Sequence, residues 1–310
     1  MTRGDFVGRD YLTLMDYGAE EISFILDTAA DLKARLHRGE PHDVLGGKTA
    51  MMIFKKLSTR TRVSFQAGCA HLGMQSFFAP SDVLQMKRGE PVKDTARVID
   101  RYCDALFIRT YDQEEVEEFA RYMDAPVINA LTDLTHPCQG LADMLTIIEH
   151  KGGLEGRKLA YAGDVFNVAQ SLMVIGSLMG MEVWVARPEG YDPDPRIMEF
   201  VERQAFGSGV HVTGSFDEAL DGADVVYANT WHSMGATNIE ERLEAYAPYQ
   251  VNEEAMAKAK PDAIFMHCLP GYRGEEMTDG VIEGPQSAVF DQAENRMHTQ
   301  KAVLYLLLGA

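Results

Sequence analysis

The stretch TAMMIFKKLSTRTR, residues 49–62, joins a short apolar run to a cluster of hydroxyl and basic side chains. Residues 49–54 are typical of a buried strand, and a helix is expected to begin near Thr61. The start of a helix suits phosphate, because its first N–H groups are unpaired and its dipole is positive there. The hydroxyls at 58–61 add donors, and Arg60 can bind an anion with two N–H groups. Phosphate binding is therefore favoured over simple helix capping with solvated arginines.

Runs of strand length alternate with helical stretches through the first half of the chain. The further strand-like runs are 75–79, 104–108 and 126–130. The helical stretches are 20–38, 61–72, 94–102, 114–123 and 141–150. Such alternation predicts a parallel sheet covered by helices on both faces.

The alternation starts again after residues 151–156, which are typical of a linker or tight turn. The strand-like runs of the second half are 158–162, 182–186, 210–213, 223–228 and 263–267. Its helical stretches are 167–179, 195–204, 253–259 and 293–308. We therefore predict two doubly wound α/β domains with parallel sheets, divided near residue 150.

The composition limits the classes of function. The 310 residues carry a net charge of −18, which argues against nucleic acid as a partner because its phosphates would be repelled. The apolar stretch 302–308 is too short to span a bilayer, and residues 1–16 lack the features of a secretory signal. The four cysteines show no CxxC spacing, which predicts reduced thiols in a cytoplasm rather than disulfides or a zinc site.

Polar side chains gather where the predicted strands of the first half end. Arg109 follows the run 104–108, and His136 and Gln139 lie in the loop after the run 126–130. Ligands of open α/β sheets bind beyond the carboxyl ends of the strands. We therefore expect these three side chains and Arg60 to converge on one anion.

Three polar segments also follow strands of the second half, at 163–167, 229–235 and 267–270. The first lacks G-x-G-x-x-G, because Phe166 and Ala169 occupy positions that need glycine, which argues against a nucleotide-binding oxidoreductase. Neighbours on an extended strand point to opposite faces, so His267 and Cys268 are not expected to form a nucleophilic pair. Trp231 is expected to be a packing residue.

Taken together in this order, these motifs closely resemble the aspartate/ornithine carbamoyltransferase family. The shared elements are STRTR at 58–62, DTARV at 94–98, HPCQ at 136–139, GYDPDP at 190–195, SMG at 233–235, HCLP at 267–270 and FDQAENR at 290–296. The resemblance covers nearly the whole length, and HCLP is typical of the ornithine branch. It implies a carbamoyl-phosphate-binding domain at 1–140, completed by a C-terminal helix at 292–310. It also implies an ornithine-binding domain at 150–285, with the active site in the cleft between the two.

The resemblance further implies a reaction and a set of site residues. The reaction transfers the carbamoyl group of carbamoyl phosphate to the side-chain amine of L-ornithine, giving L-citrulline and phosphate without a metal or organic cofactor. The residues expected to bind carbamoyl phosphate are Ser58, Thr59, Arg60, Thr61, Gln85, Arg109, His136, Gln139, Cys268, Leu269 and Arg296. Those expected to act on the reacting groups are Arg109, His136, Cys268 and Arg296. Those expected to hold the amino acid are Asn167, Asn229, Ser233 and Met234. Gln85 is expected to reach into a neighbouring subunit's site, which implies a homotrimer or an assembly of trimers.

The departures from the family pattern lie mostly in the acceptor half. Asn229 replaces the usual Asp that would pair with the α-ammonium of ornithine, and Val165 and Phe166 replace a Gly-Asn pair. Lys55 stands where an acidic residue is common. Two alternatives therefore stay open: a carbamoyltransferase for another amine or a modified ornithine, and a regulatory relative that binds carbamoyl phosphate without turnover. The retained basic residues argue against the second.

Overall fold

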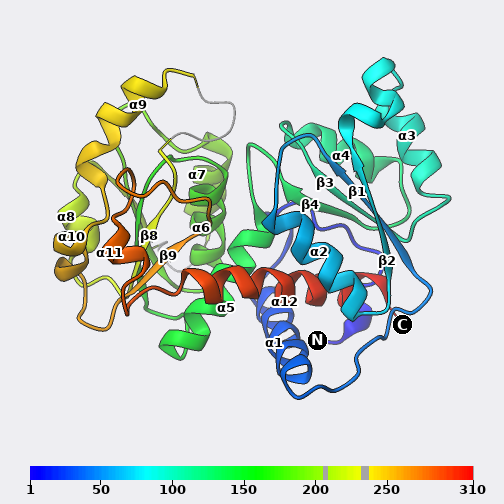
Figure 1. The fold of residues 1–310 in the computed structure, drawn as a ribbon, viewed down its shortest axis with the longest axis horizontal. Coiled ribbons are helices and arrows are strands. Elements are labelled where there is room, and N and C mark those ends of the chain that lie inside the picture. The colour runs from blue at the N-terminus through cyan, green and yellow to red at the C-terminus, as the bar shows by residue number, and fades with distance from the viewer. Residues whose placement is uncertain (205–208, 232–236, 310) are drawn as a thin grey trace. The chain divides into compact units, whose positions relative to one another are not determined.

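The computed structural model describes residues 1–204, 209–231 and 237–309, and the chain divides into two compact units. Unit 1 comprises residues 1–145 and 294–310, and unit 2 comprises residues 146–293. Each contains a parallel sheet with helices packed on it (Figure 1). The chain passes between the units inside two helices, α5 (Pro137–Lys151) and α12 (Val289–Leu308).

The sheet of unit 1 has the strand order β2-β1-β3-β4, with every pairing parallel. Its strands are β1 (Thr49–Phe54), β2 (Gln75–Pro80), β3 (Ala105–Arg109) and β4 (Val127–Leu131). Its helices besides α5 and α12 are α1 (Ala19–His37), α2 (Arg60–His71), α3 (Val92–Ile99) and α4 (Gln113–Arg121). Short 3-10 helices lie at Arg3–Asp5, Leu14–Asp16, Ser81–Val83 and Gln85–Arg88.

Side chains of alternate strand residues pack against different helices of unit 1. Ile108 belongs to a buried cluster with residues of α3 and α4, such as Ile99 and Phe119. Its neighbour Phe107 instead stacks on Phe65 of α2, with ring centroids 4.1 Å apart. This is the two-residue period of a strand buried on both faces. Each such fully buried side chain stabilises the fold by about 1.5–3 kcal/mol.

The sheet of unit 2 has the order β7-β6-β5-β8-β9 and is also parallel throughout. Its strands are β5 (Lys158–Ala162), β6 (Glu182–Ala186), β7 (Val210–Thr213), β8 (Val225–Ala228) and β9 (Ile264–His267). Its helices are α6 (Asn167–Leu178), α7 (Pro195–Glu202), α8 (Phe216–Leu220), α9 (Ile239–Tyr246), α10 (Glu253–Lys258) and α11 (Asp279–Ile282), with a 3-10 helix at Ala247–Tyr249. Helices α8, α10 and α11 lie on one side of this sheet, and α6 and α7 on the other (Figure 1).

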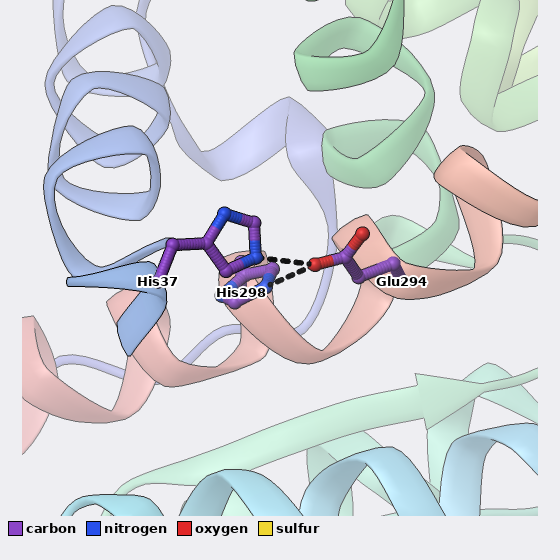
Figure 2. A group of neighbouring side chains, drawn as sticks. All are labelled: His37, Glu294 and His298. Atoms are coloured by element: carbon purple, nitrogen blue, oxygen red, sulfur yellow. Dashed lines mark hydrogen bonds and ion pairs between the residues drawn. The ribbon is translucent and has the colours of Figure 1, made fainter. Parts of the chain in front are cut away.

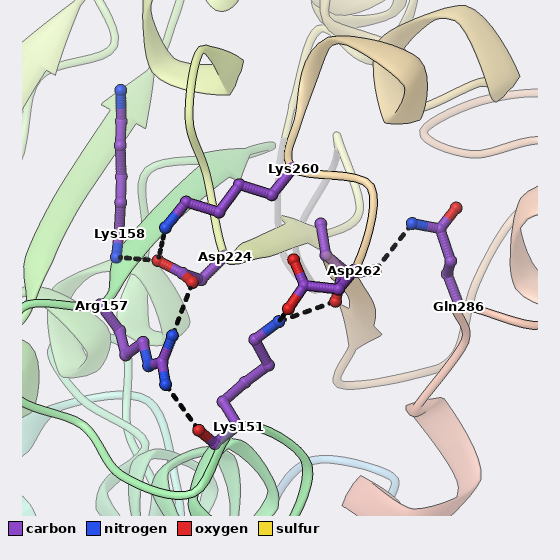
Figure 3. Close-up of polar contacts among 8 residues, drawn as sticks. Lys151, Arg157, Lys158, Asp224, Lys260, Asp262 and Gln286 are labelled. Carbon is purple, nitrogen blue, oxygen red and sulfur yellow. Dashed lines mark hydrogen bonds and ion pairs between the residues drawn. The ribbon is translucent and has the colours of Figure 1, made fainter.

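Ion pairs fix the amino-terminal edge of this second sheet (Figure 3). Asp224, directly before β8, is fully buried and accepts from Arg157 Nη1 at 3.0 Å, Lys260 Nζ at 2.8 Å and the Lys158 backbone N–H at 3.1 Å. Lys151, the last residue of α5, pairs at 2.6 Å with Asp262, which lies shortly before the first residue of β9. The starts of β5, β8 and β9 are thus held together by charge-assisted hydrogen bonds.

The predicted fold class is confirmed: two α/β domains, each with a parallel sheet. The predicted strands agree with the observed ones to within one or two residues. Helix α5 begins at Pro137 rather than 141, which puts His136 directly before its first turn. The helices α8, α9 and α11 were not predicted, because each has only four to eight residues. Across the described ranges of the chain, no helix has both the length and the apolarity needed to cross a membrane.

Candidate active site

The predicted phosphate-binding turn lies at the start of α2, as the sequence indicates. Arg60 is the first residue of this helix, and Ser58 Oγ accepts from the Thr61 backbone N–H at 3.2 Å. Ser58 therefore caps the helix, so part of the capping alternative is correct. Arg62 is directed elsewhere: its guanidinium lies 3.9 Å from the centroid of Phe78 in a cation–π contact. Arg60 is the charged residue at the start of this helix.

Arg296 connects the turn at the start of α2 to the segment after β4 by hydrogen bonds. Its Nη1 donates to Gln139 Oε1 at 2.6 Å, and its Nη2 donates to Thr61 Oγ1 at 3.0 Å. The Gln139 amide is oriented in turn by Asp143, whose Oδ1 accepts from Nε2 at 2.8 Å. All four side chains are buried, and the side-chain hydrogen bonds fix their rotamers. Three segments far apart in the sequence thus meet in one polar cluster of unit 1.

His136 lies against the same cluster. Its side chain is 4% exposed, and burial lowers its pKa well below the ordinary value of 6.5. The positive charges of Arg296, Arg109 and Arg60 lower this pKa further. These three guanidinium groups therefore lie near enough for their charge to act on the imidazole. The imidazole is therefore neutral at pH 7, within a strongly positive environment suited to an anion.

In unit 2, Asn229 follows β8 and its side chain is fixed by two contacts. The amide Nδ2 donates to the Tyr161 hydroxyl at 3.0 Å, and this hydroxyl donates to the Asp164 carbonyl at 2.7 Å. On the other side, Asn229 Oδ1 accepts from Cys268 Sγ at 3.2 Å. The amide is 3% exposed. This chain of bonds suits an amide, since a carboxylate has no N–H to give to Tyr161.

The backbone of the preceding loop also depends on Asn229. Gly163 has a φ of +149°, and a Cβ on it would lie 2.5 Å from the Asn229 carbonyl oxygen. Only glycine allows the two segments to lie this close. The adjacent Asp164 is held by an ion pair with Arg242 of α9 at 2.9 Å. The carboxyl ends of β5 and β8 are therefore packed directly against each other.

A buried pair shapes the turn after β9. His267 Nδ1 accepts from the Leu269 backbone N–H at 2.8 Å, and Nε2 lies 3.1 Å from Glu276 Oε1. The same carboxylate oxygen accepts from the Tyr272 backbone N–H at 2.7 Å. The side chains of His267 and Glu276 have no exposed surface. Since Nδ1 is an acceptor here, Nε2 carries the proton and donates to the carboxylate. His267 and Cys268 thus have different partners, as expected.

Two family models match the chain. The carbamoyl-phosphate-binding domain of aspartate/ornithine carbamoyltransferases matches residues 9–149, and the Asp/Orn-binding domain of the same family matches residues 155–307.

The chain belongs to the aspartate/ornithine carbamoyltransferase family.

Named relatives come from the ornithine branch of this carbamoyltransferase family. The ornithine carbamoyltransferase of Pyrococcus abyssi is 52% identical, over 97% of this chain and 96% of that protein. The anabolic ornithine carbamoyltransferase of Pyrococcus furiosus is 51% identical, over 97% of both chains. A solved structure of the P. furiosus enzyme has a TM-score of 0.95 at 50% identity and covers 98% of each chain. The anabolic enzyme of Campylobacter jejuni has a TM-score of 0.89 at 40% identity, over 96% of this chain and 97% of that one.

The carbamoyltransferase fold brings many of the predicted site residues together within each unit. In unit 1 these are Ser58, Arg60, Thr61, Arg109, His136, Gln139 and Arg296. In unit 2, Asn229 and Cys268 are in contact, Leu269 follows in the same turn, and Asn167 begins α6. Thr59 precedes α2, and Gln85 is exposed in the 3-10 helix Gln85–Arg88. Ser233 and Met234 lie outside the described residues.

Three residues that orient side chains of the site were not predicted from the sequence. Asp143 positions Gln139, Tyr161 positions Asn229, and Glu276 positions His267. The contact between Gln139 and Asp143 could have been predicted, because residues four apart on a helix are neighbours. The other two pairs join different segments of the chain, and nothing in a single sequence relates them. Trp231 is 4% exposed within the core of unit 2, so its predicted packing role is confirmed.

Proposed function

We propose that this protein catalyses carbamoyl transfer from carbamoyl phosphate to the side-chain amine of L-ornithine, with L-citrulline and phosphate as products. The observation that carries this proposal is the polar cluster of unit 1. There burial and the charges of Arg296, Arg109 and Arg60 keep His136 neutral. The names of the relatives at about half identity support ornithine as the acceptor.

The donor half of the reaction needs a grip on phosphate. Arg60 and the N–H groups at the start of α2 suit the phosphate oxygens, and Ser58, Thr59 and Thr61 add hydroxyl donors. Binding the dianionic leaving group among guanidinium groups lowers the cost of the charge that it gains as the C–O bond breaks. We propose that Gln139 contacts the carbamoyl group, because Asp143 fixes the direction of its amide.

The chemical step develops negative charge on the carbamoyl oxygen. The neutral amine attacks the carbamoyl carbon and a tetrahedral intermediate forms. Phosphate departs with the electrons of the C–O bond and takes the proton that the amine nitrogen loses. A neutral His136 can donate one N–H to the oxyanion, and Arg109 and Arg296 add positive charge. In the acceptor half we assign Asn167, Asn229, Ser233 and Met234 to the amino-acid backbone groups. Cys268 and Leu269 would contact the reacting carbamoyl group.

A colorimetric assay of citrulline formation from carbamoyl phosphate and L-ornithine tests the proposal, and two arginines of the same turn supply a matched pair of variants. Arg60→Gln should lower kcat/KM by about 10²–10³, the usual effect of losing one transition-state donor. Arg62→Gln should change it less than about threefold, because Arg62 is exposed and packed on Phe78. Phosphate release without citrulline, or equal losses in the two variants, would contradict the proposal.

One observation favours a second candidate, carbamoyl transfer to another amine or a modified ornithine. Asn229 is a neutral amide already bonded to Tyr161 and Cys268, where the family usually has a carboxylate for the α-ammonium. A panel of amines incubated with carbamoyl phosphate, scored by phosphate release, distinguishes the two. A higher kcat/KM with any other amine than with ornithine would favour the second candidate.

We also propose an oligomeric state, a cellular location and a metabolic role for this protein. The exposed Gln85 would reach the site of a neighbouring subunit in a homotrimer or an assembly of trimers. The four cysteines are free thiols, which fits a reducing cytoplasm. The anabolic name of the P. furiosus relative supports a role in arginine biosynthesis.

A further inference from the structure

Two histidines and a carboxylate meet in unit 1 outside the proposed active site (Figure 2). His37 is the last residue of α1, and Glu294 and His298 lie one turn apart on α12. Nε2 of His37 lies 3.0 Å from Glu294 Oε1, and Nε2 of His298 lies 3.2 Å from the same oxygen. We call these three residues the His37–Glu294–His298 cluster. Its three ligand atoms all lie within 4.8 Å of one another.

The chemical state of the cluster suits a cation. Burial lowers the pKa of His298 to about 4, so this imidazole is neutral at pH 7. Burial by itself would raise the pKa of Glu294, but the hydrogen bond from His298 and the charge of Lys33 outweigh it, so the carboxylate is ionised. An ionised carboxylate binds metal, and a neutral imidazole does so through the nitrogen that carries no proton. The proton that each Nε2 donates to Glu294 must therefore move to Nδ1 before the ion binds.

We propose that the His37–Glu294–His298 cluster binds one divalent transition-metal ion of the zinc class. A His₂Glu donor set is typical of zinc, whereas Mg²⁺ prefers oxygen ligands alone. A tetrahedral zinc ion with bonds of about 2.0–2.1 Å places its ligand atoms about 3.4 Å apart. The two nitrogen–oxygen distances of the cluster are close to that spacing, so small rotamer changes would admit the ion. The His37 side chain is 56% exposed, which leaves a route for the ion and a fourth position for water.

One neighbouring cation opposes binding. Lys33 Nζ lies 4.0 Å from Oε2 of Glu294, which is the oxygen that faces away from both histidines. The same ammonium donates to Asn295 Oδ1 at 2.8 Å and so remains on that side. The Lys33 ammonium weakens the attraction of the cluster for a metal cation, but it does not occupy the side of the Glu294 carboxylate where Oε1 contacts the histidines. The bound ion would connect the end of α1 to α12 within unit 1.

Zinc titration of the 310-residue protein by isothermal calorimetry tests the proposal, with the thermal midpoint as a second readout. His37→Gln is the informative variant, since this exposed residue ends its helix and its loss should not prevent folding. His150→Gln is the matched control. His150 Nε2 lies 2.9 Å from Asp291 Oδ2, a surface histidine–carboxylate pair with no third ligand among the described residues.

We expect the wild type and His150→Gln to bind one zinc ion at this site with equal affinity. His37→Gln should bind it at least about tenfold more weakly and lose the zinc-dependent rise in Tm. Cobalt added to the wild type should give the visible bands of a tetrahedral ion, and these should be absent in His37→Gln. Three results would overturn the proposal: no binding by the wild type, unchanged binding in His37→Gln, or an equal loss in His150→Gln.

Discussion

At the scale of a single residue, Asn229 stands where the family resemblance predicts an aspartate. Its amide is held by Tyr161 and Cys268, so the position offers a substrate only a neutral dipole. Charge-assisted hydrogen bonds contribute about 1.5–3 kcal/mol, compared with about 0.5–1.5 kcal/mol for neutral ones. The replacement therefore costs about 1 kcal/mol of ornithine binding if the α-ammonium binds here.

The substitution Asn229→Asp tests this interpretation. We expect the KM for ornithine to fall about fivefold, because the carboxylate would pair with the α-ammonium. The KM for carbamoyl phosphate should stay within about twofold, which serves as the internal control because the donor half is untouched. Steady-state kinetics with each substrate varied in turn measures both constants. An unchanged KM for ornithine would mean that Asn229 does not contact the acceptor's charge.

His136 gives a second prediction at this scale. Its pKa lies well below 6.5 because of burial and the three guanidinium groups, so lowering the pH from 8 to 6 does not protonate it. Activity should still fall over that range, because the acceptor amine is protonated more completely, with a pKa near that of lysine at about 10.4. His136→Ala should lower kcat by about 10²–10³ and leave the shape of the pH profile of kcat/KM unchanged. A limb near pH 6.5 that disappears in the variant would contradict the neutral assignment.

At the scale of elements, the apolar runs were sufficient to predict β1 to β9, because strands buried on both faces are almost continuously hydrophobic. Helix α9 was missed because it is only eight residues long, although Ile239, Leu243 and Tyr246 follow a helical spacing. The residues of the site also divide into those that the sequence indicates and those that it does not. The positions of Arg60, Arg109 and His136 at or beyond the carboxyl ends of strands could be predicted from the apolar runs. Glu276 and Tyr161 could not, since they act through residues distant in the sequence.

The prediction at the scale of elements concerns Asp224, because its hydrogen bonds join the starts of β5, β8 and β9. Burial by itself would raise its pKa, but the bonds from Lys260, Lys158 and Arg157 outweigh it and lower the pKa below 3.8. Its contribution to stability is therefore complete above pH 3.8 and is lost as the pH falls through the lower folded-state value.

We expect Asp224→Asn to lower the free energy of unfolding by about 2 kcal/mol at pH 7, less than for a fully buried pair because Arg157 and Lys260 are partly exposed. The difference from the wild type should shrink as the pH is lowered below 4. Urea unfolding at several pH values measures it, and Asp262→Asn, at an exposed carboxylate in the same network, is the control. A deficit that stays constant into the acid range would mean that packing, rather than the charge, is responsible.

At the scale of the whole molecule, the dominant electrostatic fact is the net charge of −18. Repulsion among the excess carboxylates destabilises the compact state, and it acts over distances that salt screens. The Debye length falls from about 10 Å at 0.1 M salt to about 3 Å at 1 M. Surface ion pairs such as Arg203–Glu199 are weakened by the same screening, but each contributes only about 0–1 kcal/mol. The two effects have opposite signs, so the response to salt shows which is larger.

Because repulsion involves the whole excess of acidic groups, we expect it to dominate. The Tm should rise steadily when KCl is increased from 0.05 to 1 M, and the rise should be steepest at low concentration, where the Debye length changes most. Sucrose at the same osmolality is the control, since it favours compact states without screening charge. Calorimetric scans at pH 7.5 measure both series. A Tm that falls with KCl would show that local ion pairs, such as those around Asp224, outweigh the repulsion and that the acidic surface does not limit the stability of this fold.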